Sequence, residues 1–181
     1  AAALRLPNLT GVTGLHYDEA ANVILTAEIS RGESRPIFIE SYTGKEVLFF
    51  YFAAGLMRLI GESMFALRLN GAFVGMLTIA VTYWLGRELG LSRRVALLAV
   101  ALLTVSFWHL VFSRLGFRAV SQPLLEALTV AALFRGLRRE QWRWLVIGGI
   151  FLGLTGYTYL ASRMFPVLLL LALLPLLLNR K

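Results

Sequence analysis

Two neighbouring carboxylates near the start of the sequence are the first side chains that could carry out acid–base chemistry. Asp18 and Glu19 follow His16 and Tyr17, and an apolar stripe with helical spacing comes directly after them. A carboxylate can act as a general base by taking a proton from an acceptor hydroxyl group. The two acids could instead cap a helix, because carboxylates accept hydrogen bonds from the first N–H groups and suit the positive end of the dipole. The two roles are compatible, since a capping carboxylate is held in place.

Three arginines lie in two short polar joints between apolar runs. Arg114 and Arg118 share one joint, and Arg163 follows Tyr157 and Tyr159 in the next. A guanidinium group can bind a phosphate through two parallel hydrogen bonds, so these joints predict a phosphate site. The arginines could instead extend to the headgroups of membrane lipids. The two tyrosines could likewise be interfacial anchors rather than ligand contacts.

Two further charged positions are candidates for a site. Lys45 and Glu46 precede an apolar segment, where Glu46 could complement a helix dipole or contact a substrate. Glu126 lies within an apolar run, where an acid is costly and therefore suggests a function. It could be protonated, paired with His109 or part of a site.

Several other chemistries find no support in the sequence. It contains no cysteine, so disulfides and thiol chemistry are excluded. It has no Gly-rich phosphate loop followed by Lys and Ser or Thr, no Asp-x-Asp pair and no cluster with the spacing of a metal site. We therefore expect no cofactor and predict no metal site, while the need for a divalent metal is left open.

The composition indicates an integral membrane protein. Of 181 residues, 58% are hydrophobic and only 15% are charged, and the mean hydropathy is +0.72. Soluble domains are about half apolar and about a quarter charged. The net charge of +8 arises from short clusters between apolar runs. That pattern is typical of membrane topology rather than of nucleic-acid binding.

Five apolar stretches approach the length of about 20 residues that a transmembrane helix needs. They cover residues 69–86, 95–113, 119–134, 144–162 and 164–179. Because the hydrocarbon offers no water to backbone groups, such stretches must be helical. We therefore predict an all-α polytopic transmembrane helix bundle. Residues 1–181 would form a single membrane module, with an outer loop and juxtamembrane helices in 1–66 and five transmembrane helices in 67–181.

The distribution of basic residues predicts the orientation of this bundle. Three joints carry nine basic residues, whereas the two alternating joints carry only three, which are Arg114, Arg118 and Arg163. The positive-inside rule places the first group in the cytoplasm and residues 1–66 on the outer side. The chain begins at Ala1 and ends directly after an apolar run. We therefore expect it to be the N-terminal part of a longer membrane protein.

The outer segment has a predicted structure of its own. Residues 18–30 carry an apolar stripe at helical spacing and predict a short helix that Gly32 would end. Residues 31–44 are polar and predict a loop. Residues 47–60 are apolar but too few to span a bilayer, so we expect a helix lying in the outer interface.

The order of these segments resembles the N-terminal half of the GT-C membrane glycosyltransferases, in the group similar to dolichyl-phosphate-mannose protein mannosyltransferases. The resemblance covers nearly the whole chain. It rests on the segments GLHYDEA, GKEVLFFY, ALRLNGA, YWLGR, FSRLGFR and YTYLASR, at residues 14–20, 44–51, 66–72, 83–87, 112–118 and 157–163.

The resemblance implies an enzyme that takes a sugar from a polyprenyl-phosphate carrier and passes it, with inversion, to an acceptor hydroxyl on the outer face of the membrane. It implies Asp18 as the general base, with Glu19 beside it. The implied donor-phosphate ligands are Arg114, Arg118 and Arg163. Candidate substrate contacts are His16, Tyr17, Lys45, Glu46, Tyr157 and Tyr159. The implied partners are the lipid-linked donor, the bilayer and a protein, lipid or glycan acceptor. No nucleic-acid partner is expected.

The protein would be integral to a bacterial plasma membrane, with Asp18, Arg114 and Arg118 converging in an outward-facing cavity beneath the interfacial helix. The alternative is a transporter or flippase for a lipid-linked or polar solute. Glu126 and the Gln122–Pro123 pair favour it, because transporters place polar groups and helix breaks at mid-membrane.

Overall fold

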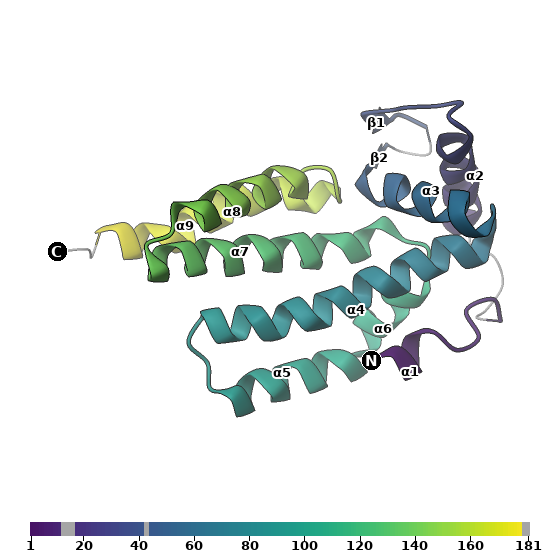
Figure 1. Cartoon of the computed structure of the whole chain (residues 1–181). Coiled ribbons are helices and arrows are strands. Elements are labelled where there is room, and N and C mark those ends of the chain that lie inside the picture. Colours follow the sequence, from purple (N-terminus) through teal and green to yellow (C-terminus); the bar gives the residue numbers. More distant parts are fainter. Residues whose placement is uncertain (12–16, 42–43, 179–181) are drawn as a thin grey trace.

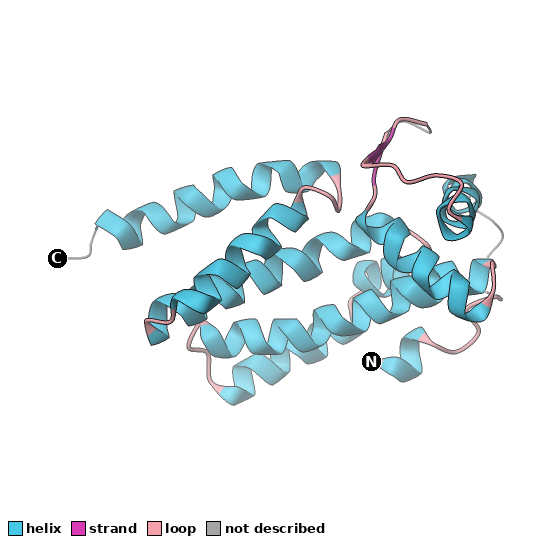
Figure 2. Cartoon of the chain, turned by 45° about the horizontal axis from the view of Figure 1, so that its top comes forward, coloured by secondary structure: helices cyan, strands magenta, loops and turns pink. Residues whose placement is uncertain are grey.

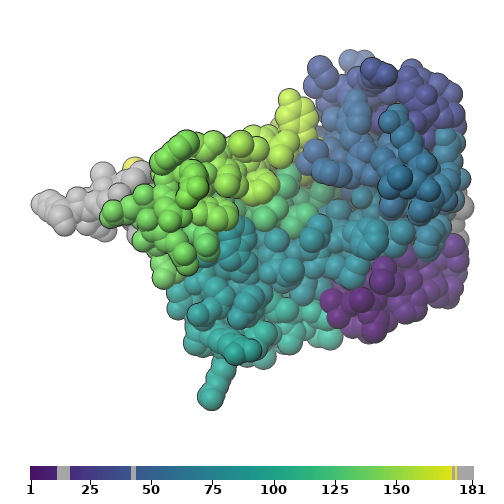
Figure 3. All heavy atoms as spheres, in the orientation of Figure 1, coloured from purple at the N-terminus to yellow at the C-terminus, as the bar shows by residue number. Residues whose placement is uncertain are grey.

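The computed structural model describes residues 1–11, 17–41 and 44–178 of the chain. Long helices lie side by side along one direction, and a smaller group of elements covers one end of them (Figure 1). We call that smaller group, made of residues 17–60, the outer cap. Space-filling atoms show the outer cap as one end of the molecule, with the loop between α7 and α8 toward the other (Figure 3).

The outer cap contains two helices and a very short antiparallel sheet. Figure 2 shows the strand pair above the helices. The elements up to the end of the cap are α1 (Ala2–Arg5), α2 (Tyr17–Arg31), β1 (Phe38–Ile39), β2 (Lys45–Glu46) and α3 (Leu48–Ile60). The predicted helices at 18–30 and 47–60 are confirmed. The predicted loop at 31–44 additionally contains β1, which pairs Phe38 with Glu46 and Ile39 with Lys45.

The remaining elements form the long helices and their joints. They are α4 (Met64–Glu88), α5 (Arg93–Val105), α6 (Phe107–Arg114), η1 (Arg118–Val120), α7 (Ser121–Arg139), α8 (Trp142–Thr155), η2 (Leu160–Met164) and α9 (Phe165–Leu178). Most of the described residues are therefore helical, in line with the predicted all-α fold, and two very short strands occur among them. The stretch 144–162 is not one helix, because α8 ends at Thr155 and a turn leads into the 3-10 helix η2.

The outer cap has a hydrophobic core of its own. Phe49, Phe50, Ala53 and Met57 recur at helical spacing along α3 and are at most 1% exposed. They pack with residues of α2 and with Leu67 at the start of α4. Burial of a large apolar side chain stabilises a fold by roughly 1.5–3 kcal/mol. This stripe therefore fixes α3 against α2 and α4.

The predicted helix at 95–113 is broken, which the sequence does not indicate. Ser106 leaves helical geometry, and α5 and α6 meet there at a bend of 58°. No Pro or Gly marks the position. Arg5 donates a hydrogen bond from Nη1 to the Thr104 carbonyl at 3.2 Å and one from Nη2 to His109 Nδ1 at 2.9 Å. A distant side chain thus binds a carbonyl next to the break, which accounts for the failure of the prediction.

Close packing of α6 on α4 places the joint that follows α6. A Cβ atom added at Gly75 would lie 2.3 Å from the Ser113 Cβ, and one added at Gly71 would lie 2.6 Å from the Leu115 carbonyl oxygen. Both distances are shorter than real contacts. Glycine is therefore required at these two positions for the 113–118 joint to lie directly against α4.

Only part of the predicted membrane topology is visible in the helix lengths. Among the described residues, α4 is the one helix that is long and apolar enough to cross a membrane by itself. The bent pair α5–α6 would form a second span if the two helices are counted together. The other three predicted spans correspond to α7, α8 and α9, and their crossing of the bilayer stays a prediction.

Candidate active site

One pocket brings together residues from segments that are far apart in the sequence. It has a volume of about 410 Å³ and lies between the first turns of α2, strand β2, the joint from α6 to η1, and the turn before η2. The residues that line it are Asp18, Asn22, Lys45, Phe112, Phe117, Arg118, Ala119 and Tyr159. A carboxylate and two basic side chains therefore border the same space.

Asp18 is the carboxylate of this pocket. It lies in the first turn of α2, where a negative charge complements the helix dipole. The side chain is exposed, unlike that of the adjacent Glu19. Its charge acts on Lys45, whose protonated form it favours. An exposed carboxylate beside two cations can accept a proton from a molecule that enters the pocket.

Lys45 is the buried cation of this pocket. Its side chain comes from β2 and is only 2% exposed. Its Nζ donates a hydrogen bond to Asn22 Oδ1 at 2.6 Å. Burial lowers the pKa of Lys45, Asp18 partly offsets this effect, and Arg118 adds to the lowering. The pairing of β2 with β1 holds the lysine at this place.

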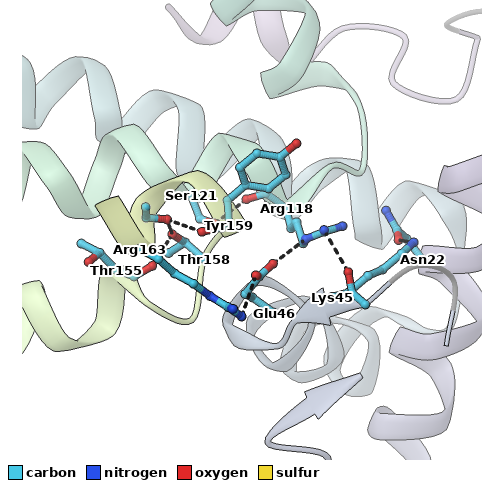
Figure 4. A network of polar contacts seen from close by, with 11 residues as sticks. Asn22, Lys45, Glu46, Arg118, Ser121, Thr155, Thr158, Tyr159 and Arg163 are labelled. Carbon is cyan, nitrogen blue, oxygen red and sulfur yellow. Dashed lines mark hydrogen bonds and ion pairs between the residues drawn. The ribbon is translucent and has the colours of Figure 1, made fainter. Parts of the chain in front are cut away.

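Arg118 is the second cation, and three neighbours orient it (Figure 4). Its Nε donates to Glu46 Oε2 at 3.1 Å, and its Nη2 donates to the Gly44 carbonyl at 3.3 Å. Its guanidinium group lies over the Tyr159 ring, 5.2 Å from the centroid. Such a preorganised cation needs little rearrangement when it stabilises a negative charge.

Glu46 connects the joint after α6 with the turn of η2. Its carboxylate is nearly fully buried and also accepts a hydrogen bond from Arg163 Nη2 at 3.4 Å. Arg163 lies over the Phe38 ring, 5.9 Å from the centroid. The sequence suggested Glu46 as a substrate contact, but here it holds Arg118 and Arg163 in place. Arg163 is not among the residues that line the pocket.

Glu19 and Arg114 also point away from the pocket. Glu19 is 0% exposed and forms a two-point ion pair with Arg68, at 2.9 and 2.8 Å. It also accepts a hydrogen bond from the Gly116 N–H at 2.8 Å. Glu19 therefore joins α2 to α4 and to the 113–118 joint, and it does not share the position of Asp18.

Arg114 is the second of these residues. Its guanidinium group donates to the carbonyl oxygens of Leu4 and Pro7 at 2.8 and 2.9 Å. It therefore attaches the N-terminal segment to the end of α6 instead of lining the pocket. The expected convergence of Asp18 with both arginines is met by Arg118 and not by Arg114.

The remaining described candidates do not line the pocket. Tyr17 is 80% exposed beside Asp18, and Tyr157 contributes its carbonyl oxygen to a hydrogen bond from the Leu48 N–H at 3.1 Å. His16 lies outside the described residues. The suggested pair of Glu126 and His109 is not formed, because Glu126 accepts a hydrogen bond from Gln122 and His109 accepts one from Arg5.

Asn22, which no sequence pattern singled out, lines the pocket with both polar atoms of its amide engaged. Its Nδ2 donates to the Gly116 carbonyl at 2.7 Å, while its Oδ1 accepts from Lys45. The partners fix the orientation of the amide, since an ammonium can only donate and a carbonyl can only accept. Asn22 follows Asp18 by four positions, so helical spacing places both on one face of α2. That spacing was the available signal.

Comparison with known proteins supports a family assignment. A family model for dolichyl-phosphate-mannose-protein mannosyltransferases matches residues 45–181. No curated protein matches the chain, and neither does any solved structure. The match includes Lys45, Glu46, Arg118 and Tyr159, whereas α2 with Asp18 precedes it. Because the match covers well over half of the chain, the protein belongs to the dolichyl-phosphate-mannose-protein mannosyltransferase family of membrane glycosyltransferases.

Proposed function

We propose that this protein transfers a sugar from a polyprenyl-phosphate carrier to an acceptor hydroxyl in the pocket lined by Asp18, Lys45 and Arg118. The observation that supports this most directly is the meeting of one exposed carboxylate with two oriented cations in a single cavity. A transfer between a hydroxyl and a sugar phosphate needs both kinds of group, one to accept a proton and one to stabilise the departing phosphate.

The proposed reaction is a single displacement. Asp18 takes the proton of the acceptor hydroxyl as the hydroxyl oxygen attacks the anomeric carbon. The bond between that carbon and the phosphate oxygen breaks, and its electron pair leaves with the lipid phosphate. Lys45 and Arg118 stabilise the charge that develops on the phosphate. One displacement inverts the configuration at the anomeric carbon.

The proposed setting is the outer face of a bacterial plasma membrane. There α4, the bent pair α5–α6, and the helices α7 to α9 form a polytopic bundle, and α3 lies along the interface. Exposed apolar side chains on these helices support this arrangement, since Leu98, Leu102 and Leu170 are each about 60% exposed or more. Lipid would cover such side chains in the membrane.

A donor panel tests the proposed function. The full-length protein in membranes is incubated with polyprenyl-phosphate sugars that differ in the sugar, together with hydroxyl acceptors. Release of free polyprenyl phosphate with labelling of an acceptor is the expected result. Movement of intact donor across the bilayer without cleavage would instead support the transporter alternative. Folded protein that cleaves no donor in the panel would contradict the proposal.

Replacing Arg118 with alanine is expected to impair donor use selectively. Hydrogen bonds to charged groups contribute about 1.5–3 kcal/mol, so the donor KM should rise roughly 10- to 100-fold. The acceptor KM should change little, because Arg118 is assigned to the phosphate. Steady-state kinetics with each substrate varied in turn provides the measurement.

Arg114→Ala is the matched control for Arg118→Ala. It removes an arginine from the same joint, but one whose guanidinium binds carbonyls of the N-terminal segment. Its donor KM should stay near the wild-type value. An equal rise of donor and acceptor KM in Arg118→Ala would show that Arg118 only supports the fold.

Asn22→Asp is expected to raise the pKa of Lys45. The neutral amide accepts the lysine hydrogen bond without cancelling its charge, whereas a carboxylate at 22 would stabilise the protonated amine. Among the described residues, the charged groups that act on Lys45 are Asp18 of α2 and Arg118 of η1, with Glu46 next to it on β2. A new ion pair should weaken donor binding, because the phosphate then competes with a carboxylate for Lys45.

The rate of amine acylation as a function of pH measures this effect. Lys45 is one of only two lysines in the sequence, so peptide mapping identifies it readily. In the wild type, the lowered pKa of Lys45 means that protonation of this lysine lowers the stability of the folded state at low pH. This cost is relieved as the pH rises through the folded-state pKa. In Asn22→Asp the acylation curve should shift to higher pH. A shift to lower pH, or none, would contradict this role of Asn22.

A further inference from the structure

Four aromatic side chains extend from the pocket along the outside of α6. Phe112 and Phe117 line the pocket, and their ring centroids are 6.3 Å apart. Trp108 stacks on Phe112 at 6.2 Å, and Phe107 contacts Trp108 at 5.5 Å. We call these four residues the aromatic track. It is continuous, because each ring contacts the next.

The aromatic track lies on the outer side of α6. Phe107 and Trp108 are each 68% exposed, and Phe112 is 36% exposed. Trp108 and Phe112 are four residues apart, so they lie on one face of the helix. Ser113, by contrast, is fully buried against Gly75 of α4. The helix thus presents its aromatic residues outward and its small residue to the bundle.

The aromatic track is bordered by cations at its pocket end and is apolar at its other end. At the pocket, Phe117 is next to Arg118 in the sequence and borders the same cavity as Lys45. Away from the pocket, the track follows the eight residues of α6, a distance of about 12 Å, to the break at Ser106. A cationic end that continues into an apolar path is complementary to an anionic headgroup with a hydrocarbon chain.

We propose that the aromatic track binds the isoprenoid units nearest the phosphate of the donor lipid. This inference rests on the proposed function, since the phosphate occupies the pocket in both. The track faces lipid, yet it differs from other exposed apolar surface because it leads directly into the pocket. The chain of a donor held at Lys45 and Arg118 must leave the pocket, and Phe112 and Phe117 form part of its wall.

A comparison of donor chain lengths tests this inference. Trp108→Ala leaves the pocket lining intact but removes the centre of the track. With a donor that carries a long polyprenyl chain, its KM should rise about two- to tenfold, because the packing contacts between the indole ring and the chain are lost. With a donor that carries a single isoprene unit, its KM should stay at the wild-type value.

Leu102→Ala is the matched control for Trp108→Ala. Leu102 is 61% exposed and belongs to the same bent helix pair, on the other side of the break. It is outside the track, so its loss should not change the KM for either donor. If Trp108→Ala changes both donors equally, or neither, the inference is wrong, while wild-type turnover would still support the proposed function.

Photocrosslinking provides a measurement that does not depend on turnover. The probe is a polyprenyl phosphate with a photoreactive group on its second isoprene unit, added to the full-length protein in membranes. Crosslinks should map to Trp108 and Phe112, and excess unlabelled polyprenyl phosphate should abolish them. Crosslinks confined to other helices, or unaffected by that competitor, would overturn the inference whether or not any sugar is transferred.

Discussion

Asp18→Asn is expected to lower the rate of sugar transfer by about 100- to 10,000-fold, the usual contribution of a general base. The amide has nearly the shape of the carboxylate but cannot take a proton from the acceptor hydroxyl. Asp18 is exposed and lies in the first turn of α2, so the variant should fold and accumulate normally. The measurement is single-turnover release of polyprenyl phosphate by the membrane protein.

Glu28→Gln is a suitable control for Asp18→Asn. Glu28 belongs to the same helix and carries the same charge, but it lies beside a different pocket of the outer cap. Its turnover should match the wild type. Because Asp18 favours protonation of Lys45, a modest change in donor KM is also expected in Asp18→Asn. Retained turnover in Asp18→Asn would reject Asp18 as the base.

Arg68→Met is expected to have the largest effect on stability. Removing one partner of a buried ion pair leaves the other charge unpaired in the interior and costs about 3–5 kcal/mol. Arg68 and Glu19 are almost completely buried, and Arg68 also donates to the Leu9 carbonyl at 2.8 Å. The folded fraction of detergent-solubilised protein after heating, followed by size-exclusion chromatography, gives the measurement.

Two further variants make the Arg68→Met prediction specific. Arg31→Met breaks the exposed ion pairs to Glu33 and Glu62 and should change stability much less, because water already solvates those charges. The double variant Glu19→Gln/Arg68→Met removes both buried charges and should be more stable than Arg68→Met alone. If the double variant is no better than the single one, the cost does not come from an unpaired Glu19.

Much of the helical architecture could be predicted from the sequence, because local periodicity and composition determine it. The apolar stripe at 18–30 and the short apolar segment at 47–60 correspond to α2 and α3. The break between α5 and α6 could not be predicted. It involves Arg5, about a hundred residues away, which binds the Thr104 carbonyl next to the break. No local sequence pattern can predict such a contact.

The candidate site, like the fold, could be predicted only in part from the sequence. Asp18, Lys45, Arg118 and Tyr159 were all named as candidates from their residue types and positions, and all four line one pocket. Asn22 was not named, because an asparagine in a helix carries no chemical signal without its partners. The short strand pair that holds Lys45 was also missed, since two residues are too few to show alternation.

A helical, glycosyltransferase-like membrane chain with acidic and basic candidates in the joints between its helices could be predicted from the sequence. Hydropathy, charge clusters and motif order are properties of the linear chain, so they carry this information. The three-dimensional packing was needed to separate Arg118 from Arg114 and Asp18 from Glu19. Each pair has the same charge and almost the same sequence position, so packing alone decides which member faces the pocket. The buried Glu19 binds Arg68 of α4. Arg114 binds carbonyl groups of the N-terminal segment and is therefore kept out of the pocket.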